Sequence, residues 1–181
     1  MNLFVAEFQR YKGLLEKTIE QITDEDFFRA IGGQGNSIAI IVKHLSGNLI
    51  SRFTDFLTSD GEKEWRDRES EFRIEQRDRS GLLEMWAKAW DVLEESVFSL
   101  GPDDMHKMVK IRGVQFSVEE ALARSVAHFS YHVGQIIFAA KFFTGKNWKY
   151  LSIPPGGSAQ YNTNPTKEKA INLKGSDFHS L

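Results

Sequence analysis

No proline precedes Pro102 in this sequence, and the four prolines lie at positions 102, 154, 155 and 165. A proline in a helix interior removes a backbone hydrogen bond and clashes with the preceding turn. More than half of the chain is therefore free to form long, uninterrupted helices. The later prolines instead predict helix ends and irregular segments.

Apolar residues recur at helical spacing in four stretches, residues 3–22, 38–56, 80–97 and 117–143. The fourth stretch begins with Ser117-Val118-Glu119-Glu120, a capping box in which serine and glutamate bind each other's backbone amides. It is nearly apolar all round, which predicts burial on several sides. Four long helices predict an all-α fold, and their packing predicts an antiparallel four-helix bundle.

The segments between these helices differ in composition. Residues 24–26 predict a short turn, and residues 58–79 predict a long loop because they are charged and aperiodic. Loops of that length in compact domains are usually functional or disordered. Residues 107–116 alternate loosely around Gly113, which favours a small β-hairpin before the fourth helix.

The sequence shows neither a repeat nor a second apolar core, so we expect one domain over residues 1–181. Residues 145–181 predict an irregular C-terminal tail packed on the bundle. Large apolar residues in its first part, residues 145–162, favour that packing. Residues 166–172 are compatible with a short helix.

The composition excludes several kinds of chemistry. The chain has no cysteine, so it can form neither disulfides nor thiolate metal sites, and any metal must be held by nitrogen and oxygen. A net charge of −2 disfavours nucleic-acid binding. No stretch reaches the about 18 apolar residues of a membrane span, and no signal peptide is visible. We therefore expect a cytoplasmic protein that binds neither nucleic acid nor membrane.

Two of the five histidines, His128 and His132, lie four residues apart in the fourth predicted helix. A four-residue step puts both side chains on one face, one turn apart, where two imidazoles can reach one metal ion. His44, in the second predicted helix, is a third candidate ligand. Three histidines would leave an open position for water or substrate. The same spacing also fits a buried histidine cluster without a metal.

Polar residues follow the histidines along the same helix faces. Asn48 and Ser51 lie one and two turns after His44, and Gln135 lies two turns after His128. Polar groups on an otherwise apolar face need partners. A metal with its water and substrate would supply them, and an internal hydrogen-bond network would do so equally well.

Three arginines, Arg52, Arg66 and Arg68, are candidate anchors for a substrate carboxylate or phosphate, because guanidinium forks match such groups. The alternative is that they pair with acidic residues on a solvated loop. Those acidic residues are Asp60, Glu62, Asp67 and Glu71.

The segment His132-Val133-Gly134-Gln135, with the preceding His128 and with His44, resembles the His…His-x-x-x-His-x-Gly-Gln pattern of the DinB/YfiT-like superfamily. Two longer stretches, within residues 44–72 and 148–158, are similar to one uncharacterised bacterial family in that superfamily. The resemblance extends over nearly the whole chain to about Asn162.

The resemblance implies a four-helix bundle in which His44, His128 and His132 hold a divalent ion, often zinc or nickel. It also implies a homodimer. The first and third predicted helices carry more large apolar residues than the one face that each helix buries in a bundle. This surplus favours the dimer as well. These residues are Phe4, Phe8, Trp86 and Trp90.

Members of the superfamily include thiol-dependent transferases and isomerases, among them enzymes that use mycothiol or bacillithiol. The resemblance thus implies a metal-dependent enzyme that acts on a small molecule, by S-transfer from a low-molecular-weight thiol or by hydrolysis. The alternative is a non-catalytic bundle with a structural or degenerate metal or ligand site. An enzyme needs an open coordination position, whereas a structural site is closed by a fourth protein ligand.

Overall fold

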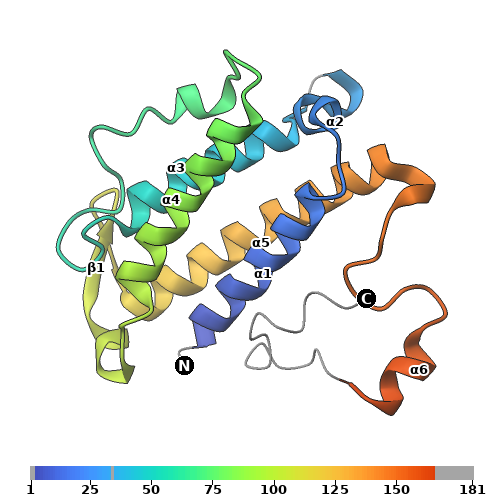
Figure 1. Cartoon of the computed structure of the whole chain (residues 1–181). Coiled ribbons are helices and arrows are strands. Elements are labelled where there is room, and N and C mark those ends of the chain that lie inside the picture. The colour runs from blue at the N-terminus through green and yellow to red at the C-terminus, as the bar shows by residue number, and fades with distance from the viewer. Residues whose placement is uncertain (1–2, 34, 166–181) are drawn as a thin grey trace.

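The computed structural model describes residues 3–33 and 35–165, which are mostly helical (Figure 1). The α-helices of this part are α1 (Leu3–Ile19), α2 (Asp24–Phe28), α3 (Ile38–Phe53), α4 (Arg79–Val97), α5 (Val118–Thr144) and α6 (Ser158–Thr163). The antiparallel strands β1 (Met108–Ile111) and β2 (Val114–Ser117) form the predicted hairpin. Short 3-10 helices lie at η1 (Ile31–Gly33), η2 (Glu69–Phe72), η3 (Pro102–His106) and η4 (Gly145–Asn147).

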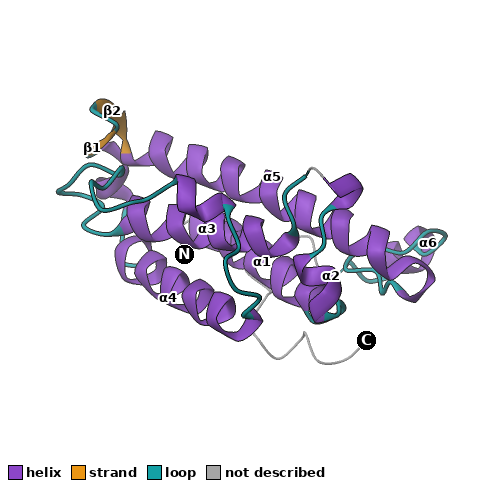
Figure 2. Cartoon of the chain, turned by 90° about the horizontal axis from the view of Figure 1, so that it is seen from above, coloured by secondary structure: helices purple, strands orange, loops and turns teal. Residues whose placement is uncertain are grey.

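The four long helices, α1, α3, α4 and α5, lie side by side (Figures 1 and 2). The closest packing joins α3 to α4 and α1 to α5, and α3 also packs against α5. Aromatic rings fill the centre, where Phe129 of α5 stacks on Trp86 of α4 and contacts Phe8 of α1. The hairpin lies at one end of the long helices and α6 beyond the other (Figure 2).

Helix starts follow the caps in the sequence. Ser37 caps α3, and its hydroxyl accepts a hydrogen bond from the Ile40 N–H. Ser117 caps α5, where its hydroxyl accepts from the Glu120 N–H while the Glu120 carboxylate accepts from the Ser117 N–H. The predicted capping box is therefore confirmed, and α5 ends at Thr144 next to Gly145 as expected.

Two local expectations were wrong. The turn expected at residues 24–26 belongs to the short helix α2, whose cap Thr23 accepts a hydrogen bond from the Asp26 N–H. Acidic residues in its first turn favour that helix end, and the buried Phe27 anchors it. The apolar face expected to run to 22 and 56 is helical only to Ile19 in α1 and Phe53 in α3.

The long predicted loop is confirmed between α3 and α4, and hydrogen bonds hold it on α3. The Ser51 hydroxyl donates to the Gly61 carbonyl and accepts from the Lys63 N–H. Further along, the Lys43 ammonium donates to the carbonyls of Ser70 and Arg73, at 2.7 and 2.9 Å. These contacts fix η2 against the middle of α3.

The same loop is joined to the hairpin. The Asp60 carboxylate accepts hydrogen bonds from the backbone N–H groups of Arg112 and Gly113, at 2.8 and 2.7 Å. The Gly61 N–H donates to the Lys110 carbonyl at 2.8 Å. Loop, hairpin and the C-terminal end of α3 thus form one connected unit.

The tail after α5 packs less than expected. Trp148 and Leu151 are half-buried, whereas most of residues 152–165 are exposed. The Lys149 N–H donates to the Gln21 side-chain carbonyl at 2.8 Å, which ties the start of the tail to the turn after α1. The short helix expected at residues 166–172 lies outside the described residues.

The apolar surface is distributed differently from the expectation. Phe8, Trp86 and Trp90 are buried in the core and Phe4 is half-buried, so these four side chains leave little of the expected apolar surplus on α1 and α4. The expectation that α5 is buried on several sides was wrong on one face, where Phe138 and Phe142 are 68% and 62% exposed. Of the helices described, none has the length and apolar character needed to cross a membrane.

Candidate metal centre

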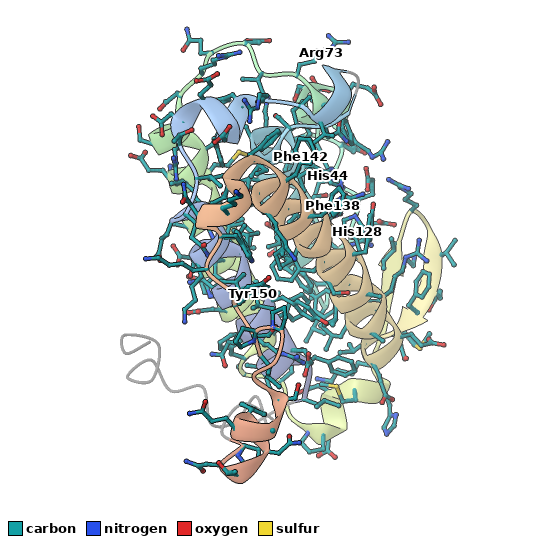
Figure 3. All side chains as sticks on the ribbon, turned by 90° about the vertical axis from the view of Figure 1, so that its right-hand side faces the viewer. His44, Arg73, His128, Phe138, Phe142 and Tyr150 are labelled. Atoms are coloured by element: carbon teal, nitrogen blue, oxygen red, sulfur yellow. The ribbon has the colours of Figure 1, made fainter. Side chains whose placement is uncertain are left out.

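His44 of α3 lies next to His128 of α5 (Figure 3), and His132, one turn further along α5, joins them. One ring nitrogen from each histidine lies within 4.8 Å of the other two. The Nε2 atoms of His44 and His128 are 3.3 Å apart. Two nitrogens bound to one tetrahedral zinc ion at about 2.0–2.1 Å lie about 3.3 Å from each other. The geometry is therefore compatible with a metal site.

Two helices position the histidines. His128 and His132 share one face of the long, doubly capped helix α5, and α3 packs against that helix to bring His44 opposite them. His44 and His132 are buried, whereas His128 is half-buried. His128 is therefore the most exposed of the three histidines.

A buried carboxylate orients His44. The His44 Nδ1 atom donates to the Glu71 carboxylate at 2.8 Å. Arg66 binds the same carboxylate with two further hydrogen bonds, at 2.8 and 3.0 Å. Gly47 makes room for it, since a Cβ atom at that position would lie 2.3 Å from a Glu71 oxygen. With its proton on Nδ1, the His44 ring directs the Nε2 lone pair into the cluster, as metal-bound histidines do.

Glu71 is charged in this setting. Burial opposes its ionisation, but hydrogen bonds from His44 and Arg66 hold the pKa of the Glu71 carboxyl below its ordinary value. The carboxylate thereby acts as an acceptor for both neighbours. It is a positioning group for His44 and not a free base.

His132 is oriented in a similar way by a neighbour on its own helix. Its Nδ1 atom donates to the Gln135 side-chain carbonyl at 2.8 Å. Its Nε2 atom is buried and has no hydrogen-bond partner in the described part of the chain. Leaving a buried polar group unpaired costs about 1–3 kcal/mol. A metal ion bound to Nε2 would remove that cost.

Both α5 histidines are neutral at ordinary pH. Burial, together with the neighbouring His132 and His44, lowers the pKa of His128 to about 3. Burial likewise lowers the pKa of His132 to about 4. Metal ligation needs a deprotonated ring nitrogen, so these two histidines can bind a cation without first losing protons.

Aromatic rings flank the cluster. Phe72 of η2 packs on His44, with ring centroids 5.1 Å apart, and Tyr131 packs on His132 at 4.0 Å. Among residues 3–33 and 35–165, no fourth histidine, aspartate or glutamate joins the ligand group. A hollow of about 430 Å³ adjoins the centre, lined in part by Tyr131 and Gln135, but the three histidines do not line it.

The polar residues expected around the centre have different roles. Gln135 contacts the centre, but through His132. Ser51 secures the loop on α3 and does not touch the histidines. Asn48 is half-buried and makes no side-chain hydrogen bond within the described ranges. Arg52 is buried and touches none of the three histidines through a hydrogen bond within the described ranges.

The two arginines of the loop, Arg66 and Arg68, lie in different environments. Arg66 pairs with Glu71 and, at 3.4 Å, with Glu62, so the ion-pair interpretation holds for it, although the pair is buried and not solvated. Arg68 is exposed, with Glu69 at 4.0 Å.

Sequence reasoning did not assign Glu71 to the centre. It lies 27 positions from His44 in an aperiodic loop, where no spacing rule connects the two. The only signal was its place in the stretch of loop that carries the family resemblance. The position of the Glu71 carboxylate depends on contacts of Lys43 and Arg66, which hold the loop and Glu71 in place.

Residues 1–157 match the family model described as "Protein of unknown function (DUF1572)", and the chain belongs to this family. Neither the curated proteins nor the solved structures include a match to the chain.

Proposed function

We propose that this protein is a metal-dependent enzyme of the DinB/YfiT-like type, in which His44, His128 and His132 hold a zinc or nickel ion. The observation that carries the proposal is the buried, unpaired Nε2 atom of His132 beside the other two rings. Hydrogen bonds at the Nδ1 atoms of His44 and His132 leave their Nε2 lone pairs for a cation.

The arrangement of the long helices supports the bundle type. Two tightly packed pairs, α3 with α4 and α1 with α5, surround one core, and the histidines come from α3 and α5. The resemblance places the ligand histidines on the second and fourth long helices of such a bundle. The cytoplasmic location expected from the sequence stays part of this proposal.

A divalent ion held by His44, His128 and His132 would lower the pKa of bound water to about 7 or deprotonate a bound thiol. The only carboxylate that touches the three rings within the described ranges is Glu71, and His44 and Arg66 already occupy it. The protein therefore offers little to act as a separate base. This favours S-transfer, in which a small thiol is itself the nucleophile, over hydrolysis.

We also propose a homodimer, built on α5 and not on α1 and α4. Tyr131, Phe138 and Phe142 follow one another at helical spacing on α5, and all three are exposed. Figure 3 shows Phe138 and Phe142 along this face of the helix. Contiguous apolar patches of this kind are typical of protein interfaces. Because Tyr131 packs on His132, a second copy on this face would border the metal centre.

A cobalt(II)-substituted sample tests whether the centre is open to a thiol. Addition of 2-mercaptoethanol should produce a sulfur-to-cobalt charge-transfer band, because three protein ligands leave a free position. The same titration of the His132→Ala variant is the control. A cobalt spectrum that does not respond to thiol would indicate a closed, structural site and would contradict the enzyme proposal.

A further inference from the structure

Arg52, at the end of α3, is a buried arginine without a partner. Arg52 is only 9% exposed, and its buried Nη1 atom makes no hydrogen bond within the described ranges. Within the described ranges, Arg52 forms no ion pair within 4.0 Å either. A buried charge is normally paired, because an unpaired one costs much free energy. The guanidinium therefore lacks a group of opposite charge.

The guanidinium remains charged at neutral pH. Burial lowers the pKa of Arg52 only to about 10, and the charge of Glu62 opposes the decrease. The missing partner is thus an anion and not a neutral group.

The two glutamates of the loop nearest to this arginine, Glu62 and Glu71, are already engaged. Glu71 is held by Arg66 and His44. Glu62 lies 3.4 Å from Arg66 and 3.3 Å from Arg112. Among the charges that act on Arg52, three arginines outnumber the one carboxylate, Glu62. The arginines whose charges act on Arg52 are Arg66, Arg112 and Arg124.

The loop holds the Arg52 side chain in place. A Cβ atom at Gly61 would lie 3.0 Å from Arg52 Cδ and 3.1 Å from Nη1, so the loop backbone packs directly on the guanidinium. Ser51 ties the Gly61 carbonyl to α3. The arginine is therefore preorganised by the fold and is not a mobile surface group.

Arg52 lies beside the metal centre. It follows His44 by about two turns of α3, and side chains of a helix lean toward its N-terminus, which here means toward His44. Its positive charge, with that of Arg66, contributes to the lowered pKa of His128. Arg124 lies one turn before His128 on α5 and is exposed, as is Arg112, so this region borders solvent.

We propose that Arg52 is the centre of an oxyanion-binding subsite beside the three histidines, flanked by Arg112 and Arg124, which takes a carboxylate or phosphate group of the substrate. A guanidinium fork binds such a group with two parallel hydrogen bonds. The substrate is then a small anionic molecule, held at one end by Arg52 while its reacting group reaches the histidine cluster. That the reacting group goes to a metal at the histidines rests on the proposed function.

Phosphate and succinate are suitable probes, titrated calorimetrically into the full-length protein at constant ionic strength. Metal-free and metal-loaded protein should both bind a probe, since the subsite consists of arginines. The probe that binds more tightly identifies phosphate or carboxylate as the preferred group. Arg52→Gln should weaken binding by about tenfold or more, and Arg52→Lys by less. The control, Arg68→Gln, removes an exposed arginine of the same loop and should not change the affinity.

Equal affinities of wild type and Arg52→Gln would overturn the inference. So would binding that appears only after metal loading and is indifferent to Arg52, which would put the anion on the metal and leave the proposed function intact. Binding through Arg52 by a protein that takes up no metal would support the subsite and contradict the proposed function. If Arg52→Gln does not fold, thermal denaturation of the wild type is the test. The inference would be overturned if neither phosphate nor succinate raised the melting temperature above that measured in chloride at the same ionic strength.

Discussion

The Glu71 carboxylate accepts a hydrogen bond from His44 Nδ1 at 2.8 Å, across 27 positions of sequence. This contact fixes which nitrogen of His44 carries the proton and so which nitrogen faces His128 and His132. The loop between α3 and α4 therefore contributes to the centre without supplying a ligand. The long, aperiodic loop thus places one carboxylate against the histidine cluster.

Glu71→Gln should weaken metal binding by about 10- to 100-fold, because the outer partner of a ligating histidine sets its tautomer and basicity. The amide keeps the size of the side chain but no longer neutralises Arg66. Competition with a chromophoric chelator measures the affinity. Glu69→Gln, at an exposed position of the same loop, is the matched control. Unchanged affinity in Glu71→Gln would mean that the carboxylate has only a structural role.

Gly47→Ala should disturb the centre through Glu71, which packs on α3 at this glycine. The added methyl group would lie 2.3 Å from a Glu71 oxygen, so Glu71 or the loop must move. Overpacking of this kind costs about 1–3 kcal/mol, and we expect metal affinity to fall with stability. Gly134→Ala on α5 is the control, since a Cβ atom there meets nothing within 4 Å. It should leave affinity unchanged and add up to about 1 kcal/mol through helix propensity. Similar effects of the two substitutions would contradict this explanation.

The metal-free protein should lose stability as pH falls from about 6.5 toward 4. The pKa of His128 lies near 3 and that of His132 near 4 in the folded chain, below the about 6.5 of an unfolded histidine. Over that interval the unfolded chain binds more protons than the folded one, so stability rises with pH. Thermal denaturation at pH 7 and pH 5 measures the effect. The double variant His128→Gln/His132→Gln should show a flatter dependence, and equal slopes would refute the assignment.

The outer face of α5 should form the dimer contact. Phe138→Ser combined with Phe142→Ser removes two exposed aromatic rings from that face, and light scattering should then show a monomer where the wild type is a dimer. Trp65→Ser, at another exposed aromatic residue in the loop, should leave the dimer intact. A wild-type protein that is monomeric at high micromolar concentration would count against the dimer itself.

Local signals in the sequence predicted most of the helices and two of the three histidines of the centre. The capping box at Ser117 and Glu120 and the four-residue step from His128 to His132 depend only on neighbouring residues, so they could be recognised directly. His44 could be included because an apolar helix face implies contact with another helix. These parts of the fold follow from helix geometry.

Other features depend on contacts between distant segments. The position of Glu71 is set by Lys43 and Arg66, and no periodicity connects these residues. The exposure of Phe138 and Phe142 could not be predicted either, because an all-apolar helix does not reveal which face remains uncovered. The helix α2 is too short for a periodic pattern and owes its place to Thr23 and the buried Phe27.

Metal analysis of the protein, purified without an affinity tag or chelator, tests the central claim most directly. We predict about one zinc or nickel ion per chain, as three histidines with an open position would hold. His132→Ala should reduce the content to background while circular dichroism confirms a folded protein, and His106→Ala, at an exposed histidine outside the cluster, should retain it. A folded wild-type protein that contains no divalent metal, and takes up neither zinc nor nickel from solution, would contradict the account.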